Sequence, residues 1–128
     1  MLAGNDANAA ALAGEAGVAA FAPLTALLPR CCAAVVSGAY GSVAAAVTAG
    51  IPTVVHPQLF DQFWHGRQVR TLGVGALART VGQVAERVES ILGDDVRAKA
   101  QDLAASMASE DGVGVAVDAI KRAIATAG

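Results

Sequence analysis

The chain has 128 residues, enough for one domain with a hydrophobic core and too few for two substantial domains. Hydrophobic residues make up 55% of the sequence and charged residues 16%, a balance that excludes an intrinsically disordered chain. The net charge of -2 and the pI near 5.5 provide no cationic field for a polyanion, which argues against a nucleic-acid-binding protein. We therefore expect residues 1–128 to form a single domain.

The first expected elements are short. Residues 6–16 predict a helix, and Val18–Phe21 predicts a strand that ends before Pro23, because proline donates no ladder hydrogen bond. Thr25–Leu28 predicts one helical turn that stops before Pro29.

Residues 31–60 contain no Asp, Glu, Lys or Arg, and this stretch is long enough to cross a membrane. Glycines and prolines divide it into short pieces, which favours buried strands flanking a helix over a membrane-spanning helix. The N-terminus lacks the basic region of a signal peptide, so we expect a cytoplasmic protein. Cys31 and Cys32 are adjacent and have no nearby His or Cys partner, so they predict buried free thiols rather than a disulfide or a metal site.

The middle of the chain predicts a compact βαβ unit. Ala33–Val36 and Thr53–Val55 are short runs rich in β-branched residues and predict strands. Between them, a glycine turn leads into a helix from about Ser42 to Ala49 that ends at Gly50. Such a unit predicts parallel strands joined by a right-handed crossover, and therefore an α/β fold.

A further helix and strand follow this unit. Residues 61–72 predict a helix that ends at Gly73, and Val74–Ala78 predicts the next strand. A helix between two strands extends the same layered α/β pattern.

The last third of the sequence predicts three helices. Thr80 and Gln83 predict a capping box at the first of them, and Asp94 or Asp95 is expected to cap the second. Each helix has apolar residues at helical spacing, which predict one face buried in the core. These residues are Val81, Val84, Val88 and Ile91, then Val96, Ala100, Leu103 and Met107, then Val113, Val117, Ile120 and Ile124.

The segment from Val35 to Gln62 carries the most chemical information. At its start a strand leads through small residues directly into a helix, so main-chain N–H groups are left free at the helix start and, with the helix dipole, form a site for a phosphate. Gly38 and Gly41 allow the backbone to approach a ligand closely. Tight strand-to-helix turns also use glycine for purely structural reasons, so this pattern alone leaves both interpretations open.

Asp61 and Gln62 follow the next strand along the chain. Ligands of open parallel sheets bind beyond the carboxyl ends of the strands, so this pair is expected to face the same crevice as the glycine turn. A carboxylate and an amide can together bind several hydroxyls of a sugar. The structural alternative is that Asp61 caps the helix that follows it.

Four short motifs accompany the glycine turn. In chain order they are Phe21-Ala22-Pro23-Leu24, Leu27-Leu28-Pro29-Arg30-Cys31, Ala49-Gly50-Ile51-Pro52 and Pro57-Gln58-Leu59-Phe60-Asp61-Gln62. Their order and spacing resemble the C-terminal domain of family 1 glycosyltransferases with the GT-B fold, in particular bacterial enzymes that glycosylate natural products. The resemblance covers nearly the whole chain and implies an incomplete Rossmann-like parallel sheet with flanking helices and a helical C-terminus.

The resemblance also implies how a nucleotide sugar is bound. An aromatic ring stacks on the base, a role that falls to Phe21, and the backbone of Ala22 reads the base edge. Hydrogen bonds to the sugar hydroxyls would come from Asp61 and Gln62. The implied co-substrate is a UDP or TDP sugar. We expect no other cofactor, no metal, and no nucleic-acid or membrane partner. The diphosphate would be bound by the turn and the helix start, at Ser37, Gly38, Ala39, Gly41 and Ser42.

Several positions depart from the family pattern. Ser37 stands where family members usually have a histidine that donates to the diphosphate, and serine cannot carry a positive charge. Tyr40 replaces a small residue, and its ring is large enough to crowd or cover the phosphates. His56 is either a substitute for the missing histidine or a structural residue. The resemblance places His65 on the wrong side of the molecule for catalysis.

Family enzymes have an N-terminal domain that binds the acceptor and supplies the catalytic base, and residues 1–128 do not match it. We therefore expect no catalytic residue here. Met1–Gly4 matches the end of the second strand of the donor domain, so the first strand and helix of that domain lie outside the match. In a sheet of order 3-2-1-4-5-6 that first strand is central. Its absence predicts a rearranged sheet, an edge-to-edge homodimer or a complementing N-terminal half.

The sequence thus favours the donor-binding portion of a glycosyltransferase that transfers a hexose to a small-molecule acceptor, inactive alone because the base is absent. An alternative is a truncated, catalytically inactive homologue that acts as an auxiliary or interaction protein, as Ser37 and Tyr40 would indicate. A sugar-nucleotide epimerase of related architecture is a third alternative, which the Asp61-Gln62 pair disfavours.

Overall fold

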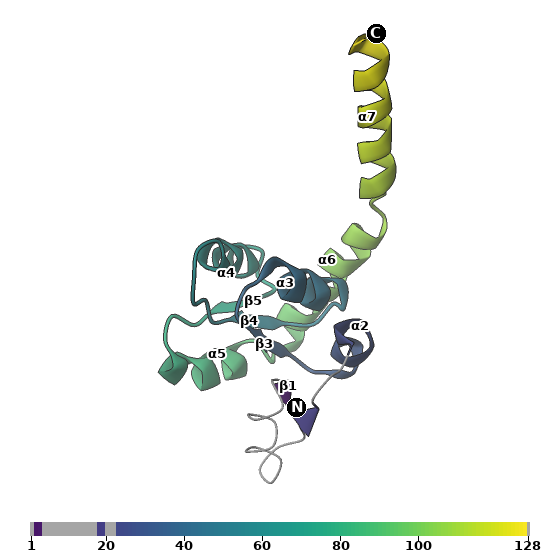
Figure 1. The fold of residues 1–128 in the computed structure, drawn as a ribbon. Coiled ribbons are helices and arrows are strands. Elements are labelled where there is room, and N and C mark those ends of the chain that lie inside the picture. The colour runs from purple at the N-terminus through teal and green to yellow at the C-terminus, as the bar shows by residue number, and fades with distance from the viewer. Residues whose placement is uncertain (1, 4–17, 20–22, 128) are drawn as a thin grey trace.

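A three-stranded parallel sheet lies at the centre of the computed structural model, which describes residues 2–3, 18–19 and 23–127 (Figure 1). The strand order is β3-β4-β5, and Val54 of β4 pairs with Val35 on one side and Ala76 on the other. The strands are β3 (Ala34–Val36), β4 (Thr53–Val55) and β5 (Gly75–Leu77). All three strands expected in this part of the sequence are confirmed, each within two residues at either end.

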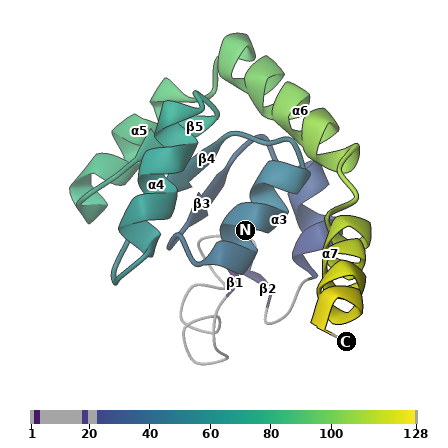
Figure 2. The ribbon, with the colours of Figure 1, turned by 90° about the horizontal axis from the view of Figure 1, so that it is seen from above.

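Helices cover both faces of this sheet. On one face α3 (Tyr40–Thr48) and α4 (Gln62–Thr71) lie side by side, as the view from above shows (Figure 2). On the other face α5 (Val84–Ser90) packs on β4 and β5. Every side chain of β4 is buried, which is what a strand covered on both faces requires. The expected α/β layering, an incomplete parallel sheet with flanking helices, is confirmed.

The core side chains alternate between the two faces of the sheet. Val55 packs with Val69 of α4 on one face, while Val54 packs with Ile91, just after α5, on the other. Because successive strand residues point to opposite faces, β4 contributes side chains to both layers of the core.

Glycines end the two helices that cover the first face. Gly50 has φ +67 and Gly73 has φ +72, the left-handed conformation that closes a helix with little strain in glycine. Both predicted stops are therefore confirmed. The start of α3 lies two residues earlier than expected, at Tyr40, because the Ala39 carbonyl accepts the N–H groups of Ser42 and Val43.

The N-terminal part forms a second, smaller sheet. In it β1 (Leu2–Ala3) pairs in parallel with β2 (Val18–Ala19), and neither strand is hydrogen-bonded to β3. The described strands have thus not closed up into one rearranged sheet. The helix expected over residues 6–16 and the end of the strand expected at Val18–Phe21 lie outside the described residues.

The helical turn before β3 does not stop at Pro29. Instead α2 (Leu24–Leu27) continues directly into the short 3-10 helix η1 (Leu28–Arg30), with Pro29 in its first turn. Proline is compatible with that position because the N–H groups of a first helical turn have no intrahelical acceptor.

Neither predicted helix cap after β5 forms. The short 3-10 helix η2 (Val81–Gln83) precedes α5, and the Thr80 side chain makes no capping bond. The amide oxygen of Gln83 accepts the N–H of Arg79 at 2.8 Å, one residue before the position that a capping box requires. At α6 (Asp94–Ala108) the cap position belongs to Gly93, and both aspartates lie inside the first turn, where the helix dipole favours them.

The three C-terminal apolar stripes differ in how far they are buried. The stripe before and along α5 packs on the sheet except for Val81, which is exposed. In α6, Ala100 is buried while Met107, at the far end, is 38% exposed. The prediction of a buried stripe is wrong for α7 (Gly112–Ala127), which extends away from the domain with all of its apolar side chains exposed (Figure 1). Helical spacing shows that one face is apolar and carries no information on what covers it.

The structure also tests the expectation of buried cysteine thiols and bears on the question of a membrane-spanning helix. Cys31 is half-buried and Cys32 is exposed, so burial of both thiols is a wrong prediction. Within the described ranges, no helix is both long and apolar enough to cross a membrane.

Candidate functional site

The glycine turn between β3 and α3 fits closely against the following strand and helix. Gly38 has φ +93, and a Cβ atom there would lie 2.7 Å from Cγ1 of Val55 and 3.0 Å from the carbonyl oxygen of Gln62. Only glycine fits this position. Gly38 is also the one buried residue between positions 37 and 41, so the outer side of the turn is open to solvent.

Four successive N–H groups are free on this turn. Ala39 caps α3 without any side-chain bond, and no acceptor among the described residues bonds the N–H groups of residues 38–41. The N–H and the hydroxyl of Ser42, by contrast, both donate to the Ala39 carbonyl, at 3.1 and 2.8 Å. The donor groups therefore come from Gly38, Ala39, Tyr40 and Gly41, while Ser42 has only its oxygen lone pairs left to offer.

The loop that precedes α4 is held by its own glutamine. Oε1 of Gln62 accepts the N–H of Gln58 at 2.8 Å and that of Leu59 at 3.1 Å. Since the oxygen is engaged in the loop, the NH₂ group of Gln62 is the part that remains for a ligand.

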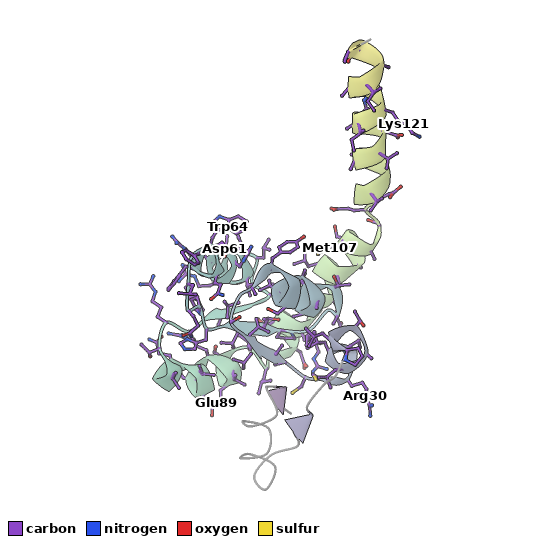
Figure 3. All side chains as sticks on the ribbon, viewed as in Figure 1. Arg30, Asp61, Trp64, Glu89, Met107 and Lys121 are labelled. Carbon is purple, nitrogen blue, oxygen red and sulfur yellow. The ribbon has the colours of Figure 1, made fainter. Side chains whose placement is uncertain are left out.

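Asp61 does not act as a side-chain cap. It occupies the position before α4, but its backbone is helical and its carboxylate makes no capping bond. The residue is exposed. Figure 3 shows it near Trp64, on the α4 side of the sheet and opposite to Glu89. The structural alternative for Asp61 is thus not what the structure shows.

The turn and the loop are direct neighbours. Gly38 packs on Gln62 so closely that no Cβ fits between them. The two segments therefore meet at the carboxyl edge of the sheet, while a shared crevice for Asp61, Gln62 and the turn stays a prediction. Ser37 is exposed at the end of β3, while Phe21 and Ala22 lie outside the described residues, so base recognition stays a prediction.

The two histidines differ in their relation to the turn. Nδ1 of His56 lies 2.9 Å from the carbonyl oxygen of Ala78, beyond β5 and therefore away from the turn. This favours the structural role for His56. Nδ1 of His65 lies 2.8 Å from the carbonyl oxygen of Gly38, so His65 lies beside the turn, while its side relative to an acceptor stays a prediction.

A sequence signal for His65 did exist. The less exposed positions of α4 include Gln62, Gly66 and Val69, which share one helical face with His65. A polar residue on a packed helix face requires a hydrogen-bond partner. The pattern does not say which partner, because Gly38 is distant in sequence.

Tyr40 lies on the α4 side of the turn. Its ring is 74% exposed, and its centroid lies 6.0 Å from that of His65. Together they border a cavity of about 350 Å³ between α3, α4 and α6. Its walls are mostly apolar, including Val43, Trp64, Leu72 and Leu103, and so they offer little to a diphosphate or to sugar hydroxyls.

Phe60 has an unusual backbone conformation that the sequence does not reveal. Its φ is +44 and its ring is 88% exposed. A non-glycine residue in the left-handed region is strained, by about 1–2 kcal/mol. This strain lies in the loop that positions Asp61.

Replacing Phe60 by glycine should therefore stabilise the domain. We expect a gain of about 0.5–1 kcal/mol in the free energy of unfolding, because the relief of strain outweighs the greater entropy of glycine in the unfolded chain. Urea denaturation measures it. Phe63→Gly is the matched control and should be destabilising, because Phe63 lies inside α4. Equal losses in the two variants would contradict strain at Phe60.

Comparison with known proteins decides the family. Residues 2–120 match the family model described as "Erythromycin biosynthesis protein CIII-like, C-terminal domain". The chain belongs to this family. The resemblance to the C-terminal domain of GT-B glycosyltransferases is thereby confirmed.

Solved glycosyltransferases share the fold of this family member. The glycotransferase of kitacinnamycin matches with a TM-score of 0.73 and 26% identity, over 83% of this chain and 29% of that one. The glycosyltransferase SnogD from Streptomyces nogalater matches with a TM-score of 0.63 and 30% identity, over 73% and 26% of the two chains.

Curated relatives include sterol 3-beta-glucosyltransferases. The one from Aspergillus fumigatus is 40% identical over 93 residues, which are 70% of this chain and 7% of the relative. One from Arabidopsis thaliana is 33% identical over 101 residues, or 75% and 16% of the two chains. The chain thus spans a small part of the length of the glycosyltransferases that it matches.

Proposed function

We propose that this domain binds the nucleoside diphosphate sugar of a glycosyltransferase, a UDP or TDP sugar whose hexose passes to a small-molecule acceptor. The observation that carries the proposal is the row of free N–H groups at residues 38–41, next to Gln62 and the loop that carries the exposed residue Asp61. The first feature suits a diphosphate and the second suits sugar hydroxyls.

The diphosphate site needs no basic side chain. Free N–H groups at a helix start point toward an anion, and the dipole of α3, a helix of nine residues, adds partial positive charge. This is consistent with a net charge of -2 for the whole chain. It is also compatible with Ser37 at the position where the family resemblance implies a histidine, because most of the donors are main-chain groups.

The same N–H groups would act in the transfer step. The acceptor oxygen bonds to the anomeric carbon while the bond from that carbon to the diphosphate breaks, and the electron pair remains on the leaving phosphate oxygen. Free N–H groups stabilise that negative charge. The acceptor proton must pass to a base, which the family resemblance places in an acceptor-binding domain, so we propose that activity requires such a domain.

We further propose that a complementing glycosyltransferase half, or a second copy of this chain, covers the surfaces left open here. Val35 lies on β3, an edge strand of the sheet that the described residues form, and is 51% exposed, and the apolar stripe of α7 is exposed as well. Edges and apolar surfaces of this kind favour association.

Titration calorimetry with UDP and TDP tests the donor proposal. We expect saturable binding of at least one of them. Absence of heat at millimolar concentrations of both would contradict the proposal and would favour the alternative of an auxiliary protein that has the fold without the ligand.

Asp61→Asn tests the sugar contact separately. We expect the affinity for UDP-glucose to fall about tenfold, since a hydrogen bond to a charged group is replaced by one to a neutral amide. The affinity for UDP should not change. Asp94→Asn, at another exposed aspartate at a helix start, is the control and should alter neither affinity. Equal losses for UDP and UDP-glucose in Asp61→Asn would argue against a sugar-binding role.

A further inference from the structure

His65 bonds the protein backbone inside the candidate site. Its Nδ1 lies 2.8 Å from the carbonyl oxygen of Gly38, across a separation of 27 residues. A carbonyl oxygen can only accept a hydrogen bond, so Nδ1 carries the proton and donates it. His65 therefore ties α4 to the turn that precedes α3.

This bond fixes the direction of a neighbouring N–H group. The carbonyl of Gly38 and the N–H of Ala39 belong to one planar trans peptide unit, in which they point in opposite directions. Because His65 holds the Gly38 carbonyl toward α4, the N–H of Ala39 points away from α4. That N–H is one of the four free donors of the turn.

Glycine makes such a restraint necessary. Gly38 has φ +93, and a glycine can rotate its peptide units more freely than any other residue. Without the bond from His65, the Gly38–Ala39 peptide unit would sample other orientations, and the N–H of Ala39 would no longer be aimed in one direction.

The imidazole ring is itself held in place. The centroid of Trp64 lies 5.2 Å from that of His65 in an edge-to-face arrangement, and Tyr40 lies on another side at 6.0 Å. His65 itself is half-buried. Such packing limits the rotation of the ring and keeps Nδ1 directed at Gly38.

We propose that His65 is a positioning residue of the donor site, which orients the N–H of Ala39 toward the diphosphate. The inference rests on the proposed function. His65 acts by donating to a protein carbonyl, and so it does not take over the direct contact with the diphosphate that a histidine at position 37 would make.

Two substitutions separate the hydrogen bond from the bulk of the ring. His65→Leu removes the donor, whereas His65→Asn retains an N–H donor attached to the same side-chain atom, Cγ. We expect His65→Leu to weaken UDP binding about five- to tenfold, as the loss of one oriented hydrogen bond implies, and His65→Asn to stay close to wild type. Uridine, which lacks the diphosphate, should bind equally to all three proteins.

His56 supplies the matched control. It makes the same kind of bond, from Nδ1 to the carbonyl of Ala78 at 2.9 Å, outside the turn. His56→Leu should therefore leave UDP affinity unchanged. Equal losses in His56→Leu and His65→Leu would overturn the proposal, because they would reflect general destabilisation.

A measurement without ligand keeps this inference separate from the proposed function. Residual dipolar couplings report the direction of the Ala39 N–H bond in the free protein. We expect the same direction in wild type and His65→Asn, and an altered or averaged one in His65→Leu. An unchanged Ala39 coupling in a folded His65→Leu protein would overturn the positioning role. Failure of the wild type to bind UDP would contradict only the donor site.

Discussion

Replacing Gly41 by valine is expected to weaken UDP binding by about a hundredfold or more while the domain stays folded. Apart from its chain neighbours and the backbone of its own helix, a Cβ atom at Gly41 would meet no atom within 4 Å, so the isopropyl group projects into open space. Side chains of a helix tilt toward its N-terminus, which places this group in front of the free N–H donors. The loss of two or more bonds to a charged ligand accounts for the size of the effect.

The stability of Gly41→Val should not fall with its affinity. Gly41 lies inside α3, where glycine is the less favourable residue by several tenths of a kcal/mol. Gly82→Val is the matched control, because Gly82 also has no atom within 4 Å of a built Cβ but lies in η2. Calorimetry and thermal unfolding of both variants separate binding from folding. Retention of wild-type affinity by Gly41→Val would place the ligand elsewhere.

Gly38→Ala should be strongly destabilising, by about 2–4 kcal/mol in the free energy of unfolding. Alanine would be strained at φ +93, and its methyl group would lie 2.7 Å from Cγ1 of Val55. Urea denaturation measures the change. The turn and the start of α4 would have to move apart, so the donor site should be lost as well.

Gly50→Ala separates the two causes of this effect. Gly50 has φ +67, but the nearest atoms to a built Cβ lie at 3.4 Å, an ordinary contact. Its loss of stability should therefore reflect backbone strain alone, about 1–2 kcal/mol. Equal losses at Gly38 and Gly50 would show that the close fit against Val55 contributes nothing.

The features that the sequence predicted well are those set by neighbouring residues. The β-branched runs at residues 34–36 and 53–55 form strands, and Gly50 and Gly73 end helices as expected. The proximity of the glycine turn to Gln62 followed from a general rule on parallel sheets. In each case the physical cause is contained in a few adjacent residues or in the topology that they define.

The features that the sequence did not predict depend on contacts between distant residues. The stripe of α7 has the spacing of a buried face and yet is exposed, because burial needs a covering surface. The bond between His65 and Gly38 links two segments that only the fold brings together. The capping box was predicted one residue out of place, because the side chain of Gln83 accepts the N–H of Arg79 and not that of Thr80.

The proposed donor site depends on the main-chain N–H groups of residues 38–41, which would bind the diphosphate of a nucleotide. A titration of the ¹⁵N-labelled protein with UDP, followed by proton–nitrogen NMR spectra, tests this binding directly. We expect the amide signals of Gly38, Ala39, Tyr40 and Gly41 to shift most, with smaller shifts at Asp61 and Gln62. UDP binding that leaves these four signals in place and moves others would contradict it.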